Sequence, residues 1–255
     1  MKDAFQAIPR KGSRLSGIGI WTASIGVVLV ALSGLAARAG VVSPFAGMGA
    51  YTAGSLLLFI AIITAGLGLL RSGGTGGTAS RPATWLALLA GLAVMANNGL
   101  LIRQATGAPP IHDISTDTDN PPAFVAVLPL RLVDAKNPPD YGGPETAAAQ
   151  KRAFPDIAPL MTTRPANVVF AAARDTVAEK GWTLVDASEV DGRIEATAET
   201  AWVHFKDDVV IRITPGRDQT RVDVRSTSRV GRGDMGTNAR RVRDYLSALQ
   251  SRLAR

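Results

Sequence analysis

Two polar segments in the second half of the chain carry the side chains that could do chemistry. The first runs from His112 to Pro122, and the second from Arg225 to Asn238. The first offers one imidazole and three carboxylates that could hold a divalent metal ion, from His112, Asp113, Asp117 and Asp119. Its spacing lacks the glycine and glutamate that an EF-hand loop requires. The favoured alternative is that these side chains cap turns in a proline-rich stretch, so we predict no metal and no cofactor.

The second segment could bind an anion. Its arginines precede a predicted helix start, where free backbone N–H groups also favour negative charge. The candidate ligand-binding residues of the two segments are His112, Asp113, Asp117, Asp119, Arg225, Ser226, Ser228, Arg229, Asp234 and Asn238.

A structural interpretation competes with ligand binding. Residues 212–255 carry eleven arginines and four aspartates, whereas residues 104–211 carry nine basic and sixteen acidic side chains. The basic strand and helix would then pair with the acidic part of the domain, including Asp113, Asp117 and Asp119. We favour this interpretation, in which the two segments form one structural unit.

A hydrolase would need a nucleophile beside a base. The chain has two histidines, His112 and His204, and Ser226 or Ser228 could supply a hydroxyl, but there is no Gly-x-Ser-x-Gly motif. His204 lies in a predicted aromatic strand, where we expect it to pack against a sheet face. The sequence therefore names no catalytic residue and is more consistent with a noncatalytic protein.

Three uncharged stretches precede these segments, at Gly17–Ala37, Val41–Leu70 and Ala83–Ile102. Each is near or above the ~20 residues that cross a bilayer as a helix. We predict a transmembrane region over residues 1–105, with spans at about 17–37, 48–70 and 83–102. A cleaved signal peptide is the weaker alternative for the first stretch, because two further apolar stretches follow it.

The positive charge lies beside these stretches. Residues 1–103 carry eight basic side chains and one acidic one, which accounts for the net charge of +7, because the remaining residues carry 20 of each sign. The cytoplasmic bias of Lys and Arg explains this excess without a nucleic-acid partner. The basic N-terminus and the loop between Arg71 and Arg81 are predicted to be cytoplasmic. We therefore predict a multi-pass protein of the bacterial inner membrane, with its C-terminal domain in the periplasm.

Residues 106–255 form the predicted soluble domain, with a proline-rich, extended start over residues 106–144. Helices are predicted at 145–152, from Pro165 to about Lys180, and at 235–253 with Asp234 as N-cap. Two hairpins pair 183–187 with 193–200 and 202–214 with 220–228. The fold class is therefore α+β, a helix, a four-stranded antiparallel sheet and a C-terminal helix behind three transmembrane helices. One face of the last strand carries Arg221, Asp223, Arg225 and Arg229 and is expected to face solvent or a ligand.

The run from His112 to Phe124, followed by the run from Arg225 to Arg241, resembles the bacterial and plant family catalogued as domain of unknown function 1499. The resemblance covers roughly His112 to Leu249 and is specific in these two motifs. It implies an exported, membrane-tethered α+β domain, and it brings no established activity or catalytic residue.

The function that we expect is a membrane-tethered periplasmic module that binds an envelope protein, or an anionic or amphipathic ligand such as a lipid, through the Arg225 to Asn238 region. The lipid bilayer is its other partner. An apolar cavity under the final helix would favour lipid, and a solid core there would count against that version. The alternative is an envelope hydrolase with a metal or Ser/His site around His112 and residues 225–238.

Overall fold

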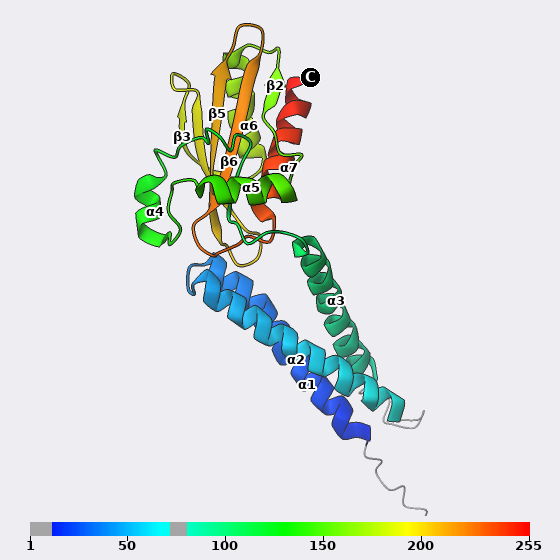
Figure 1. Ribbon diagram of the computed structural model, residues 1–255. Helices are drawn as coiled ribbons and strands as arrows, with labels where there is room; N and C mark the ends of the chain where they lie inside the picture. Colours follow the sequence, from blue (N-terminus) through cyan, green and yellow to red (C-terminus); the bar gives the residue numbers. More distant parts are fainter. Residues whose placement is uncertain (1–11, 72–80) are drawn as a thin grey trace, which may run out of the picture. The chain divides into compact units, whose positions relative to one another are not determined.

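The computed structural model describes residues 12–71 and 81–255 (Figure 1). It divides into two compact units, Met1–Arg103 with Trp202–His204, and Gln104–Ala201 with Phe205–Arg255. The basic N-terminus over residues 1–11 and the loop over residues 72–80, both predicted to be cytoplasmic, lie outside the described residues.

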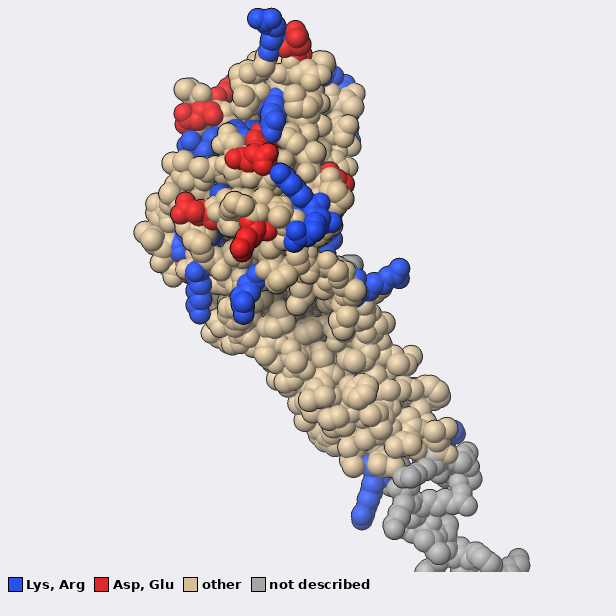
Figure 2. Space-filling model, viewed as in Figure 1, with Lys and Arg blue, Asp and Glu red and all other residues tan. Residues whose placement is uncertain are grey.

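The first unit contains three long apolar helices, α1 (Gly12–Arg38), α2 (Pro44–Arg71) and α3 (Arg81–Ala105). They are long and apolar enough to cross a membrane over Arg14–Arg38, Pro44–Leu70 and Arg81–Arg103, and the prediction of three apolar N-terminal helices is confirmed. On the face seen in Figure 2, their surface carries almost no charge between their ends. α1 and α2 pack closely where glycines face each other. A Cβ added to Gly54 would lie only 2.8 Å from the carbonyl oxygen of Gly26, so glycine is needed at this contact.

The second unit is built on an antiparallel sheet in the order β1-β6-β5-β4-β3. The strands are β1 (Asp113–Ser115), β2 (Leu160–Thr162), β3 (Thr183–Ser188), β4 (Arg193–Glu199), β5 (Lys206–Pro215) and β6 (Thr220–Ser228). The long strand β6 pairs with β5 on one side and with both β1 and β2 on the other. The predicted α+β class and antiparallel sheet are confirmed, with six strands in place of four.

Two helices, α6 (Ala166–Glu179) and α7 (Thr237–Leu253), cover one face of this sheet (Figure 1). Alternating apolar side chains of β4, β5 and β6 point at them and form the main core. The core beneath α7 is filled: Tyr245 is fully buried, stacks on Trp182 at 5.3 Å and donates a hydrogen bond to the Ala173 carbonyl. This solid packing counts against a lipid-sized cavity under the final helix.

The other face of the sheet, called the outer face below, is covered mainly by irregular chain between residues 116 and 142. This chain includes the short helix α4 (Leu128–Asp134). A further helix, α5 (Gly143–Ala153), lies beside the free edge of β1. The Gln150 side chain accepts a hydrogen bond from the Ser115 amide and donates one to the Ser115 carbonyl, as a neighbouring strand would.

The second hairpin differs from its prediction at one end. β5 begins at Lys206, because Thr200 and Phe205 close a turn through a backbone hydrogen bond and a bond from the Phe205 amide to the Thr200 hydroxyl. His204 has a positive φ of 56° within this turn. The prediction that His204 lies in a strand was therefore wrong.

Candidate functional site

A row of polar side chains crosses the outer face of the sheet. The strand registers place Asp113, Thr227, Asp208 and Thr197 opposite one another on β1, β6, β5 and β4. All four are buried. Because side chains alternate along a strand, they face away from the helix-packed core. This row lies under the irregular chain, and the arginines of the second motif reach into it.

Arg225 joins the first motif to the second. Its Nε and Nη2 donate to the two carboxylate oxygens of Asp113 at 3.0 and 2.7 Å, a bidentate pair in which both side chains are 3% exposed. Two further hydrogen bonds go from its Nη1 and Nη2 to the carbonyls of Pro122 and Pro139. Its guanidinium also lies 4.8 Å from the centre of the Phe124 ring. Arg225 thus fastens the irregular chain to the sheet at several points.

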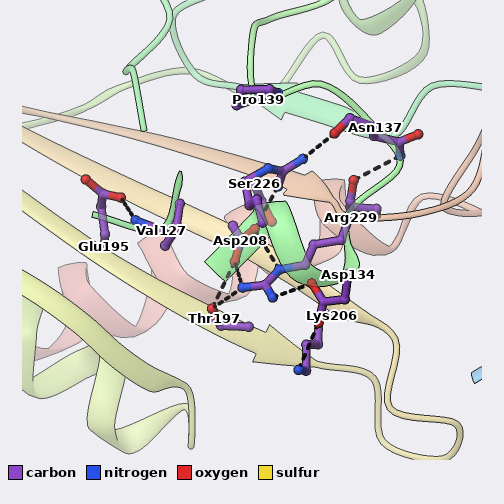
Figure 3. Close-up of polar contacts among 12 residues, drawn as sticks. Val127, Asp134, Asn137, Pro139, Glu195, Thr197, Lys206, Asp208, Ser226 and Arg229 are labelled. Atoms are coloured by element: carbon purple, nitrogen blue, oxygen red, sulfur yellow. Dashed lines mark hydrogen bonds and ion pairs between the residues drawn. The ribbon is translucent and has the colours of Figure 1, made fainter. Parts of the chain in front are cut away.

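A second buried ion-pair cluster is centred on Asp208, which accepts hydrogen bonds from Arg131 and from Arg229, the latter shown in Figure 3. Arg229 reaches both of its carboxylate oxygens, at 2.8 and 3.0 Å, and Arg131 of α4 binds Oδ2 at 2.7 Å. Arg229 also binds the Thr197 hydroxyl and Asp134, the last residue of α4. Two guanidinium groups therefore share Asp208 and hold α4 against the sheet.

Glu195 of β4 is fully buried and binds backbone groups of the irregular chain. Its carboxylate accepts hydrogen bonds from the amides of Val125, Ala126 and Val127 at 2.9 to 3.0 Å. An ion pair with Arg193 at 2.9 Å offsets its charge. These contacts set the conformation of the segment that leads into α4.

The helix-packed face holds a smaller polar cluster that joins both motifs to α7. Asn238 accepts from the Ser226 hydroxyl at 2.6 Å, and its amide donates to the Ser228 hydroxyl and to the His112 carbonyl. The carboxylate of Asp234 accepts from the amides of Gly236 and Asn238 at the start of α7. The prediction that Asp234 is the N-cap was wrong by two residues, because Gly236 holds that position, but the Asp234 side chain still binds amides at the helix start.

The two remaining candidates lie nearer the surface. Asp117 pairs with Arg212 and Arg221, which also bind the buried Asp223. Asp119 is 87% exposed and pairs with Lys151. The predicted pairing of the first motif with the basic residues 212–255 is thus confirmed for Asp113 and Asp117, but not for Asp119, whose partner Lys151 lies in α5. The expected solvent face of β6 was wrong for Asp223, Arg225 and Arg229, because the irregular chain buries them.

The buried carboxyls differ in their pKa shifts. Burial raises the pKa of Asp113 above its ordinary value, against the lowering effect of Arg225. For Asp223, burial also raises the pKa, but hydrogen bonds from Arg221 and Arg212 outweigh it, so the net shift is downward. The pKa of Asp134 is lowered in the same way by Arg229 and Lys206. The latter two carboxylates are therefore stabilised in their charged form by the fold.

This arrangement uses the candidate residues to hold the domain together. Within residues 12–71 and 81–255, no three His, Cys, Asp or Glu side chains lie close enough to hold a metal ion. A small cavity of about 230 Å³ lies elsewhere, between the start of α6 and the β3–β4 turn, and none of the candidate residues lines it. Asp208, Glu195 and Arg131 were not among the predicted site residues. The signal that could have identified them is a charged residue inside an apolar strand, for Asp208 and Glu195, or inside a leucine-rich stretch, for Arg131.

The fold and these contacts define a class of protein: a membrane protein with an α+β domain that is stabilised by an internal network of ion pairs. Residues 113–249 match the model of a family described as Protein of unknown function (DUF1499), which is more than half of the chain. The chain belongs to this family. No curated protein matches the sequence.

Proposed function

We propose that this chain is a noncatalytic binding module, anchored in a bacterial inner membrane with its α+β domain in the periplasm. The observation that supports a noncatalytic role is the pairing of its charged groups with one another. Arg225 and Arg229 are buried against Asp113 and Asp208. A general acid, base or nucleophile must reach a substrate, whereas these groups reach only protein partners.

The hydrolase alternative finds little support in this geometry. The hydroxyls of Ser226 and Ser228 are buried and hydrogen-bonded to Asn238. Binding of an anion by Arg225 or Arg229 would first require that their ion pairs break, which is costly inside a protein. The binding surface is therefore better sought among exposed side chains outside the two motifs.

Exposed apolar side chains supply such a surface. Leu132 and Val133 of α4 are 89% and 85% exposed, and Met235 and Met161 are also exposed. Neighbouring exposed apolar side chains, as at Leu132 and Val133, are typical of a site that meets another molecule, whereas Met161 lies apart on β2, opposite Arg221 at the start of β6. An envelope protein or an amphipathic ligand with an apolar part would fit it.

Photocrosslinking in the intact membrane tests this proposal. A benzophenone amino acid would be placed in the full chain at Leu132, at Met161 and at Val190, which is 99% exposed in the β3–β4 turn. We expect a discrete adduct at one position, seen as a gel shift for a protein or as a peptide mass increase for a lipid. Diffuse, equal labelling at all three positions would contradict a binding surface.

The proposed orientation has its own test. The chain contains no cysteine, so a single Val190→Cys substitution reports which side of the membrane the domain occupies. With the outer membrane permeabilised and the inner membrane intact, we expect an impermeant maleimide to label Cys at position 190. The control, Thr75→Cys in the loop predicted to be cytoplasmic, should be labelled only after the inner membrane is opened. The reverse pattern would refute the periplasmic placement.

A further inference from the structure

The short helix α4 buries a charged side chain and exposes its aliphatic ones, the opposite of an ordinary amphipathic helix. Its one arginine, Arg131, is buried against Asp208, and its aliphatic side chains point outward. Leu132 and Val133 are the most exposed, with Leu130 and Leu128 next to them. α4 lies at the edge of the domain in Figure 1. A helix normally buries its apolar face, so this exposure calls for a partner outside the domain.

The exposed side chains of α4 are held rigidly. Before the helix, three amides are bound to the carboxylate of Glu195, and Val127 is fully buried. After it, the amides of Lys136 and Asn137 donate to the Arg229 carbonyl. Arg131 also binds the carbonyls of Asn137 and Pro138. The apolar surface is therefore displayed by a fixed framework, which reduces the entropy lost on binding.

α4 lies at the end of the sheet where the chain enters the domain. Asp134, at the end of α4, binds Arg229, just after β6, and Lys206, the first residue of β5. The entering strand β1 starts at Asp113, which pairs with Thr227 at the same end of β6. Residues 106–112, which connect α3 to β1, span at most ~25 Å when fully extended. The short connection therefore limits how far this end of the domain can move from the end of α3.

We propose that α4 inserts its aliphatic side chains into the lipid interface and so docks the domain on the membrane that anchors it. This deepens, and rests on, the proposed binding function. Leucine and valine are under-represented among the residues that dominate protein–protein binding, whereas aromatic residues and arginine are enriched there. An aliphatic surface flanked by the exposed Lys136 suits acyl chains below anionic headgroups. The observations thus favour lipid over a protein partner.

The test uses the full chain reconstituted in vesicles of phosphatidylethanolamine and phosphatidylglycerol. An environment-sensitive fluorophore is attached at Leu132→Cys, and at Val190→Cys as the matched control. Val190 is even more exposed but lies in the β3–β4 turn, two residues before Gly192, whose carbonyl accepts a hydrogen bond from the Ile213 amide near the far end of β5. We expect lipids with nitroxide-labelled acyl chains to quench most of the fluorescence at position 132 and none at position 190. Adding Val133→Asp should abolish the quenching, and because Val133 is exposed the domain will still fold.

Two outcomes would overturn the inference. If position 132 is no more quenched than position 190, or if Val133→Asp leaves the quenching unchanged, α4 does not enter the lipid. A protein adduct at Leu132 in the crosslinking experiment would then preserve the binding function with a different partner. Diffuse crosslinking together with absent quenching would remove both proposals.

Discussion

The pair between Asp113 and Arg225 makes a quantitative prediction. Asp113→Ala removes the carboxylate that accepts two guanidinium hydrogen bonds and leaves the buried Arg225 charge uncompensated. Breaking one partner of a buried ion pair costs ~3–5 kcal/mol. Domains have total stabilities of ~5–15 kcal/mol. We therefore expect a domain that still folds at low denaturant but has lost a large part of its free energy of unfolding.

The assay is urea unfolding of residues 106–255, which contain their own hydrophobic core. Unfolding is followed by tryptophan fluorescence, to which Trp182, stacked on Tyr245, and Trp202 contribute. With a slope of ~2 kcal/mol per molar urea, a loss of ~4 kcal/mol lowers the midpoint by ~2 M. The matched control is Asp119→Ala, which removes an exposed pair with Lys151. Its effect should be below ~1 kcal/mol.

The double variant decides whether the pair acts as a unit. Asp113→Ala with Arg225→Ala should lose less stability than the sum of the single losses, because the second substitution removes the charge that the first leaves unpaired. A wild-type midpoint for Asp113→Ala, or strictly additive losses, would refute the structural role assigned to these residues. Binding of a ligand by Arg225 would then become the better explanation of the motif.

Three further predictions concern other parts of the domain. Glu195→Gln replaces one of two carboxylate oxygens that accept backbone amides with an NH2 group, which can only donate. The free energy of unfolding should fall by ~1–3 kcal/mol, seen as a lower melting temperature by circular dichroism. The fold lowers the pKa of Asp223, so the stability that this carboxylate contributes should be present above about pH 4 and lost as the pH falls through its folded pKa. In Asp223→Asn, the urea midpoint should therefore depend less on pH in that range. Gly192→Ala should lower the urea midpoint of the domain more than Gly181→Ala. Both glycines have a positive φ, but a Cβ at Gly192 would lie 2.3 Å from the Ile213 carbonyl oxygen, whereas a Cβ at Gly181 would meet open space.

Much of the fold could be predicted because its signals are local. Apolar length predicts the three spans, helical periodicity predicts α6 and α7, and alternation with turn residues predicts β3, β4 and β6. By contrast, β1 and β2 have three residues each and exist only because β6 offers them an edge. Such short strands have no periodicity of their own.

The site was predictable in part for the same reason. The opposite charge of the two halves of the domain predicted that the motifs would pair, and Asp113 with Arg225 does so across 112 residues. The sequence could not predict that the outer face of β6 would be buried, because an irregular, proline-rich segment covers it. Nor did the leucine-rich stretch of α4 show that Arg131 would be its buried residue, since this depends on Asp208 from a distant strand.

The place of β6 near the C-terminus determines when the domain can fold as it is made. Asp113, Asp208 and Asp117 emerge from the ribosome before their main partners Arg225, Arg229 and Arg221, and β1, β2 and β5 all pair with β6. A nascent chain that lacks β6 therefore contains acidic side chains without their arginines and strands without their neighbour. In the proposed periplasmic orientation, the domain would cross the membrane largely unfolded and fold only after its last segments arrive, as a chain threaded through an export channel does.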